Sequence, residues 1–152
     1  MESKRQLTIL FAEDNDGDAC LLEERLKEGG LANPVLRFKS GVEAWNFLSG
    51  KSEPCFEPGK TYLLVSDIHM PDMDGIELLQ RVKADPRFKS IPVIMHTSSE
   101  DPADKAVCRE LGCSEYLIKH EIFKETVALI KRRVFYAGEG CGAPERPKRD
   151  AD

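Results

Sequence analysis

Polar side chains that could bind and transfer a phosphoryl group follow four apolar runs of the sequence. Glu13 and Asp14 come directly after the first run, and Asp67 comes after the third. The fourth run leads into Thr97, and the fifth leads into Lys119. If these runs are parallel strands of an open sheet, ligands bind outside their carboxyl ends. We therefore expect the five side chains to converge in one crevice.

The chemistry of such a crevice follows from its charges. Three carboxylates in one place repel each other unless they share protons or a cation lies among them. Oxygen ligands favour a hard divalent ion, and Mg²⁺ commonly uses one or two carboxylates together with a phosphate. An ammonium from Lys119 and a hydroxyl from Thr97 would suit the oxygens of a phosphoryl group. A carboxylate can itself be the covalent acceptor, and Asp67 is the best candidate because it stands alone after its strand.

Acidic residues after strands also serve as helix caps, so this simpler role must be considered. Asp14 or Asp16 could cap the helix expected over residues 16–28, and we interpret Asp72 and Asp74 as turn or cap residues. The three crevice carboxylates alone would fit either role. Their combination with a hydroxyl and an ammonium at neighbouring strand ends favours a functional site.

The elements that must position these residues are short apolar runs alternating with longer amphipathic stretches. The expected strands cover residues 7–12, 35–38, 62–66, 91–96 and 115–118. Helices are expected over residues 16–28 and 123–134, and after the capping residues Ser40, Asp74 and Asp101. In the helix after Asp101, one face carries Ala103, Ala106, Val107 and Leu111. This alternation predicts an α/β fold, a flavodoxin-like five-stranded parallel sheet of order 2-1-3-4-5 with helices on both faces.

Composition limits the class of protein. A chain of 152 residues, 41% hydrophobic and 32% charged, fits one folded domain. We expect this domain over residues 1–136 and a flexible tail rich in Gly, Pro and charge over residues 137–152. The net charge of −5 argues against nucleic acid as a partner. Because neither a signal peptide nor a long apolar segment is visible, we expect a cytoplasmic protein without a membrane partner.

The five cysteines do not indicate a disulfide framework, because their number is odd and no CxxC spacing occurs. Cys108 and Cys113 could be half of a zinc site, but no second Cys/His pair follows at ligand spacing. Buried, inert thiols are the preferred interpretation. No GxGxxG follows the first expected strand, which disfavours a dinucleotide enzyme.

At these residues the sequence resembles the receiver domains of two-component signalling, over about residues 6–135. The segment LLVSDIHMPDMDG is similar to the phosphoacceptor segment of that family. EDN before it, and PVIMHTSS and YLIK after it, have the expected order and spacing. The resemblance is to stand-alone, chemotaxis-regulator-like receivers, and the long loop over residues 49–60 also resembles a phytochrome-associated subgroup.

The resemblance implies a response regulator that is phosphorylated in an Mg²⁺-dependent reaction. Asp67 would accept the phosphoryl group from a sensor histidine kinase. Asp14, Asp67 and the backbone carbonyl of His69 would ligate Mg²⁺ directly, and Glu13 would act mainly through water. The domain would catalyse only its own phosphorylation and dephosphorylation, and would otherwise not be an enzyme.

The resemblance also implies a conformational switch. Thr97 would bond to a phosphoryl oxygen, Lys119 would form a salt bridge to the group, and Tyr116 would turn inward when Thr97 moves. The surface of the fourth helix, fifth strand and fifth helix would then change, and an unidentified downstream protein or a second copy of the chain would bind it. No output domain is expected in the tail.

Some features depart from the family pattern or leave alternatives open. His120 stands where the family normally has proline, and His69 and Ser99 occupy positions that tune phosphorylation and dephosphorylation rates. An aspartate-dependent phosphatase would need a second carboxylate where His69 stands. A pseudo-receiver, which binds partners without phosphorylation, is the main alternative.

Overall fold

The computed structural model describes residues 7–119 and 123–138 of the chain. Strands and helices alternate strictly along these residues. The elements are β1 (Thr8–Ala12), α1 (Asp16–Glu28), β2 (Val35–Phe38), α2 (Gly41–Leu48), β3 (Tyr62–Ser66), α3 (Gly75–Ala84), β4 (Val93–Thr97), α4 (Pro102–Leu111), β5 (Glu115–Ile118) and α5 (Phe123–Gly138).

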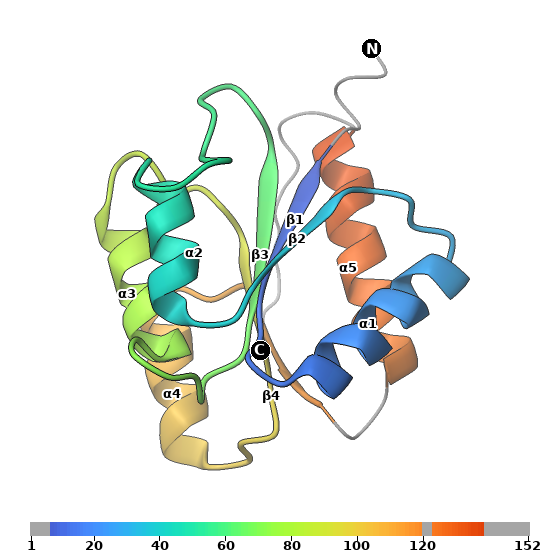
Figure 1. The fold of residues 1–152 in the computed structure, drawn as a ribbon. Coiled ribbons are helices and arrows are strands. Elements are labelled where there is room, and N and C mark those ends of the chain that lie inside the picture. Colours follow the sequence, from blue (N-terminus) through green and yellow to red (C-terminus); the bar gives the residue numbers. More distant parts are fainter. Residues whose placement is uncertain (1–6, 120–122, 139–152) are drawn as a thin grey trace.

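The strands form a parallel sheet of order β2-β1-β3-β4-β5, which confirms the predicted topology. Helices cover both faces of this sheet. Figure 1 shows α1 and α5 on one face and α2, α3 and α4 on the other. The order reverses at β1 and β3, and such a switch point is where open α/β sheets bind ligands.

Alternation along the strands builds a separate hydrophobic core on each face. Leu10, Leu64 and Met95 face the core shared with α2, α3 and α4. Their neighbours Ile9 and Leu63 face the core shared with α1 and α5. Since helices cover both faces, β3 and β4 are buried along their whole length, as their nearly continuous apolar sequence predicts.

Side-chain caps fix where the helices on one face begin. The side chains of Ser40, Asp74 and Asp101 accept hydrogen bonds from backbone amides in the first turns of α2, α3 and α4. These predicted caps are confirmed. Asp72 has a φ of 70°, a left-handed conformation that aspartate tolerates in turns. The interpretation of Asp72 and Asp74 as turn and cap residues is therefore correct.

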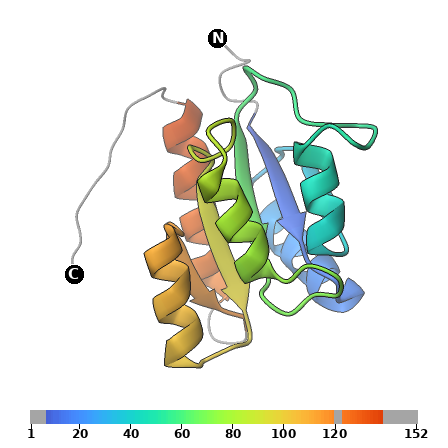
Figure 2. The same cartoon turned by 90° about the vertical axis from the view of Figure 1, so that its left-hand side faces the viewer.

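Helix α4 buries a different side from the one that the sequence pattern suggests. Ala103 and Ala106 are exposed, and Val107 is 40% exposed. The buried residue is Cys108, and Leu111 packs partly against the same core. Figure 2 shows α4 at the outer edge of its helix layer, where its main contacts with other elements are with α3 and β5. Only a narrow side of the helix is therefore covered.

The final helix ends beyond the predicted domain boundary. Helix α5 reaches Gly138, whereas the tail was expected to begin at residue 137. Residues 139–152 of that tail, and also His120, lie outside the described residues. None of the helices in the described ranges combines the length and the apolar character needed to cross a bilayer.

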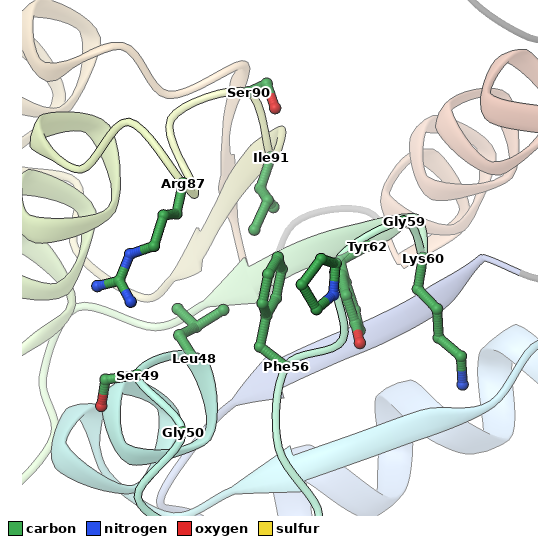
Figure 3. Close-up of a pocket in the computed structure, with 11 residues that line it drawn as sticks. Leu48, Ser49, Gly50, Phe56, Gly59, Lys60, Tyr62, Arg87, Ser90 and Ile91 are labelled. Carbon is green, nitrogen blue, oxygen red and sulfur yellow. The ribbon is translucent and has the colours of Figure 1, made fainter.

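The loop over residues 49–61 folds onto the opposite end of the sheet from the predicted site. The Phe56 ring packs 5.0 Å from the Phe88 ring and 5.3 Å from the Tyr62 ring. The Tyr62 hydroxyl accepts a hydrogen bond from the Glu57 amide at 3.0 Å. Figure 3 shows Phe56, Tyr62 and Ile91 beside a pocket of about 510 Å³. This pocket lies at the amino ends of β3 and β4, so it is separate from the predicted site.

Candidate functional site

Strand register brings the predicted site residues to one edge of the sheet. The last residues of β1 and β3 are paired, so Glu13 and Asp67 follow at the same level. The Asp67 amide extends this pairing by donating to the last β1 carbonyl at 3.0 Å. On the other side, the Lys119 amide donates to the Thr97 carbonyl at 2.8 Å. The loops after β1, β3 and β4 gather at the lower end of the sheet in Figure 1.

The Lys119 ammonium lies among three carboxylates at this edge. Its Nζ is 2.8 Å from Glu13 Oε1, 2.8 Å from Asp18 Oδ2 and 2.9 Å from Asp67 Oδ2. Glu13, Asp67 and Lys119 are buried, whereas the Asp18 side chain is 31% exposed. We refer to Glu13, Asp14, Asp67 and Lys119 together as the acidic crevice.

Burial and charge shift the pKa values of the two innermost groups. Burial raises the pKa of the Glu13 carboxyl, contact with Lys119 opposes the rise, and the Asp67 charge adds to it. Burial alone would lower the pKa of the Lys119 ammonium. Its contacts with Asp18, Glu13 and Asp67 outweigh that effect and raise this pKa above its ordinary value. Lys119 is therefore charged at neutral pH and compensates part of the negative charge.

The carboxylates of the crevice have the geometry of a cation site. Glu13, Asp14 and Asp67 each offer a carboxylate oxygen, and the three ligand atoms lie within 4.8 Å of one another. Asp14 is exposed, which leaves an approach from solvent. An all-oxygen, acidic donor set suits a hard divalent cation such as Mg²⁺. The residues present therefore fit the predicted metal.

The backbone around Asp67 is packed closely against the start of α3. Asp67 Oδ1 accepts a hydrogen bond from the Ile68 amide at 2.6 Å. The Gly75 amide donates to the Ile68 carbonyl at 2.7 Å. A Cβ atom at Gly75 would lie 1.9 Å from the Asp67 carbonyl oxygen, a distance that no packing allows. The absence of a side chain at Gly75 therefore permits the close approach of α3 to the Asp67 backbone.

Thr97 ends β4 at the same edge of the sheet, and its hydroxyl binds backbone instead of a side chain of the crevice. Its Oγ1 accepts a hydrogen bond from the Ser99 amide at 3.1 Å, and the residue is fully buried. Within the described residues, the hydroxyl makes no hydrogen bond to Asp67 or Lys119. The Tyr116 hydroxyl donates to the Ser99 carbonyl at 3.0 Å. Thr97 and Tyr116, which the sequence links in a switch, therefore both contact Ser99.

Arg37 of β2 is a site residue that the sequence analysis missed. Its Nε and Nη2 donate to the Glu13 carbonyl at 2.9 and 2.7 Å, and its Nη1 lies 2.8 Å from Asp16. The guanidinium thus holds the chain immediately before Asp14. A signal was present, because Arg37 is the charged residue of an otherwise apolar strand beside the acidic pair.

Asp18, in the first turn of α1, is the second residue that was missed. Asn15 caps this helix, because its Oδ1 accepts a hydrogen bond from the Asp18 amide at 2.8 Å. Neither Asp14 nor Asp16, the two residues considered from the sequence as possible caps, therefore caps α1. The Asn15 amide also donates to Glu13 Oε2 at 3.1 Å. Because α1 begins at the crevice, side chains in its first turn could have been expected to reach Lys119.

Replacing Asn15 with alanine should lower the free energy of unfolding by about 1 kcal/mol, since an N-cap side chain is lost. Urea denaturation followed by circular dichroism measures this change. Asp101→Ala is a matched control, because it removes an equivalent cap from α4, away from the crevice. Equal losses in both variants would agree with capping alone, and an unchanged Asn15→Ala variant would contradict the assignment.

The remaining candidate ligands lie apart from the crevice carboxylates. The His69 side chain is exposed, and the predicted metal contact through its backbone carbonyl stays a prediction. Cys108 is buried and Cys113 is half-buried, and burial raises their pKa values to about 11 and about 12. In the described ranges, the Glu13, Asp14 and Asp67 group is the cluster of three or more metal-ligating side chains, so a zinc half-site gains no support.

Comparison with known proteins identifies relatives whose family agrees with the geometry of the site. A family model described as the response regulator receiver domain matches residues 9–131. Chemotaxis protein CheY1 of Helicobacter pylori is 29% identical over 127 residues, which cover 82% of this chain and 96% of CheY1. Response regulator Rcp1 of Synechocystis sp. is 30% identical over 130 residues, covering 86% of this chain and 88% of Rcp1.

Solved structures include similar proteins. The phosphorylated cyanobacterial phytochrome response regulator RcpA is 26% identical with a TM-score of 0.73, over 91% of this chain and 98% of RcpA. The Mn²⁺-bound form of response regulator Rcp1 is 28% identical with a TM-score of 0.72, over 91% of this chain and 99% of Rcp1. These relatives therefore match both the sequence and the fold.

Proposed function

Since the chain belongs to the response regulator receiver domain family, we propose that it accepts a phosphoryl group on Asp67 from a sensor histidine kinase, in a reaction that depends on Mg²⁺. The observation that carries this proposal is the acidic crevice. Three carboxylates and a buried ammonium meet there at the switch point of the sheet. One carboxylate would be enough to neutralise the Lys119 ammonium in a purely structural ion pair. The negative charge of the other two carboxylates is then left for a cation to compensate.

The proposed metal ligands are Asp14, Asp67 and the backbone carbonyl of His69, with Glu13 acting through water. When bound, Mg²⁺ neutralises charge on the oxygens of the incoming phosphoryl group. The domain's own residues orient the reactants. Lys119 already contacts Asp67 Oδ2 at 2.9 Å, so a short shift brings an N–H donor to a phosphoryl oxygen.

In the transfer step, a carboxylate oxygen of Asp67 forms a bond to phosphorus. The bond between phosphorus and the imidazole nitrogen of the donor histidine breaks, and that nitrogen keeps the electron pair. The Ile68 amide, which donates to Asp67 Oδ1 at 2.6 Å, holds the carboxylate in place. The product is an aspartyl phosphate.

The signal would pass from Asp67 to the surface through Ser99. The Thr97 hydroxyl oxygen accepts from the Ser99 amide at 3.1 Å, and its own O–H can donate to a phosphoryl oxygen, so a shift of Thr97 towards Asp67 would pull on the Ser99 loop. The Ser99 carbonyl binds the Tyr116 hydroxyl, so movement of this loop reaches β5 directly. Ser99 Oγ also donates to Asp104 of α4 at 2.6 Å. Phosphorylation would thus reshape the α4–β5–α5 surface.

We propose that this surface binds an unidentified downstream protein in the cytoplasm, or a second copy of the chain. The similarity to the phytochrome response regulator RcpA supports a sensor kinase of the phytochrome type as the donor. The pseudo-receiver alternative is less well supported, because the acceptor, acidic pair and lysine are assembled in contact distance.

Phosphorylation of the intact domain tests the proposal. Incubation with acetyl phosphate and MgCl₂ should add the mass of one phosphoryl group, and EDTA should prevent this gain. Hydroxylamine should remove the group, because it cleaves acyl phosphates. Beryllofluoride with Mg²⁺ should shift amide resonances around Asp67 and Ser99. A domain that shows neither change, and is not phosphorylated by a cognate kinase, would disprove the proposed function.

A further inference from the structure

The Lys119 ammonium is engaged by three carboxylates before any phosphoryl group arrives, because it donates hydrogen bonds to Asp18 and Asp67 and forms an ion pair with Glu13. An ammonium has three N–H donors, and Lys119 Nζ contacts three carboxylate oxygens at 2.8 to 2.9 Å. Two of these partners, Glu13 and Asp67, also belong to the cation site. A metal ion and the ammonium therefore compete for the same two carboxylates.

Asp18 is the partner that does not take part in this competition. It contacts Lys119 at 2.8 Å but lies outside the group of carboxylates that converge for a cation. Its backbone is fixed by the Asn15 cap, and its place in the first turn of α1 favours a negative charge. It therefore offers Lys119 a firmly placed anion beside the metal ligands.

We propose that Asp18 is a positioning residue for Lys119, which holds the ammonium on the α1 side of the crevice and so leaves Glu13 and Asp67 available to Mg²⁺. This inference rests on the proposed function and assigns to Asp18 an influence on its Mg²⁺-binding step. Without the Asp18 charge, Lys119 settles on Glu13 and Asp67 and opposes metal binding. Once metal is bound, the same ammonium has a spare donor for a phosphoryl oxygen.

Removal of the Asp18 charge should change Mg²⁺ binding and anion binding at Asp67 in opposite directions, which distinguishes both effects from a loss of folding stability. Loss of the Asp18 charge should weaken Mg²⁺ binding, because the ammonium competes better and one attractive charge is gone. Loss of the same charge should favour an anion at Asp67, because repulsion falls and an N–H donor is released. A variant that merely loosened the fold would weaken both ligands together.

The experiment compares Asp18→Asn with the wild-type domain in two NMR titrations. In the first, MgCl₂ alone is added, and we expect a dissociation constant raised roughly three- to tenfold, the size of a partly exposed, charge-assisted contact. In the second, beryllofluoride is added at saturating Mg²⁺, and we expect the variant to bind it at least as tightly as the wild type.

Two further variants make the comparison specific. Asp16→Asn removes the same charge from the same helical turn, but Asp16 pairs with Arg37 and Lys39 instead of Lys119. We expect its Mg²⁺ affinity to change less than about twofold. Asp18→Glu keeps the charge, and its Mg²⁺ affinity should return towards the wild-type value. Thermal melting of each variant reports whether the fold is intact.

An Asp18→Asn variant with unchanged Mg²⁺ affinity would overturn the inference, and so would equal weakening of both ligands with a lowered melting temperature. Either result leaves the proposed function standing if the wild-type domain is still phosphorylated on Asp67. If the wild-type domain itself responds to neither Mg²⁺ nor beryllofluoride, the proposed function fails and takes this inference with it.

Discussion

Asp67→Asn is expected to abolish phosphorylation, with at least about a 100-fold drop in phosphoryl incorporation from acetyl phosphate, because an amide cannot replace the carboxylate nucleophile. The fold should persist. The amide has the shape of the carboxylate, and its oxygen can still accept from the Ile68 amide. Lys119 keeps Glu13 and Asp18 as partners. Intact-mass spectrometry with Mg²⁺ present, and with hydroxylamine added afterwards, measures the change.

The matched control is Asp72→Asn, in the same loop. Asp72 has a positive φ, which asparagine adopts readily, and its side chain is exposed. This variant should be phosphorylated as the wild type is. Hydroxylamine-sensitive phosphorylation of Asp67→Asn at the wild-type level would show that another residue is the acceptor. In cells, unchanged signalling by Asp67→Asn would instead favour the pseudo-receiver alternative.

Gly75→Ala should lower the free energy of unfolding by about 3 kcal/mol or more, since the new methyl group collides with backbone and not with a movable side chain. The Cβ would lie 1.9 Å from the Asp67 carbonyl oxygen and 2.9 Å from Ile68 Cα. Relief requires that α3 and the acceptor loop move apart. We therefore also expect phosphorylation of the surviving folded molecules to be impaired. Urea denaturation measures the stability change.

Gly17→Ala provides the comparison for this prediction. Gly17 lies in α1, and the nearest atom to its added Cβ would be Asn15 Oδ1 at 3.3 Å. Alanine favours helix over glycine, so the variant should gain between about 0 and 1 kcal/mol. If Gly75→Ala were as stable as Gly17→Ala, the close approach of α3 to Asp67 would be refuted.

Much of the fold and most of the crevice could be predicted from the sequence, because both depend on periodicity. Runs such as residues 62–66 are apolar throughout, which predicts a strand covered on both faces. Once the strands are parallel, their carboxyl ends must share an edge. That rule alone predicts that Glu13, Asp67 and Lys119 lie close together, although more than 100 residues separate Glu13 from Lys119 in the sequence.

Features that depend on side-chain reach could not be predicted in this way. Asp18 and Arg37 each contact a residue of a different element, Lys119 and Glu13 respectively. The periodicity of a helix or strand predicts which face a side chain is on, but it does not predict which residue of a neighbouring element that side chain contacts. Helix α4 shows a second limit. Its small apolar residues Ala103 and Ala106 suggest an inner face, but a helix at the edge of a layer can leave such residues exposed.

The loop over residues 49–61 has an evolutionary consequence. It is fastened by one aromatic side chain of its own, Phe56, which packs on Phe88 and Tyr62 at the end of the sheet remote from Asp67. Insertions, deletions and drift in this connection can therefore accumulate without touching the reactive carboxylates. The loop and the crevice carboxylates lie at opposite ends of the sheet, so the length and sequence of the loop can change without breaking a contact of the crevice.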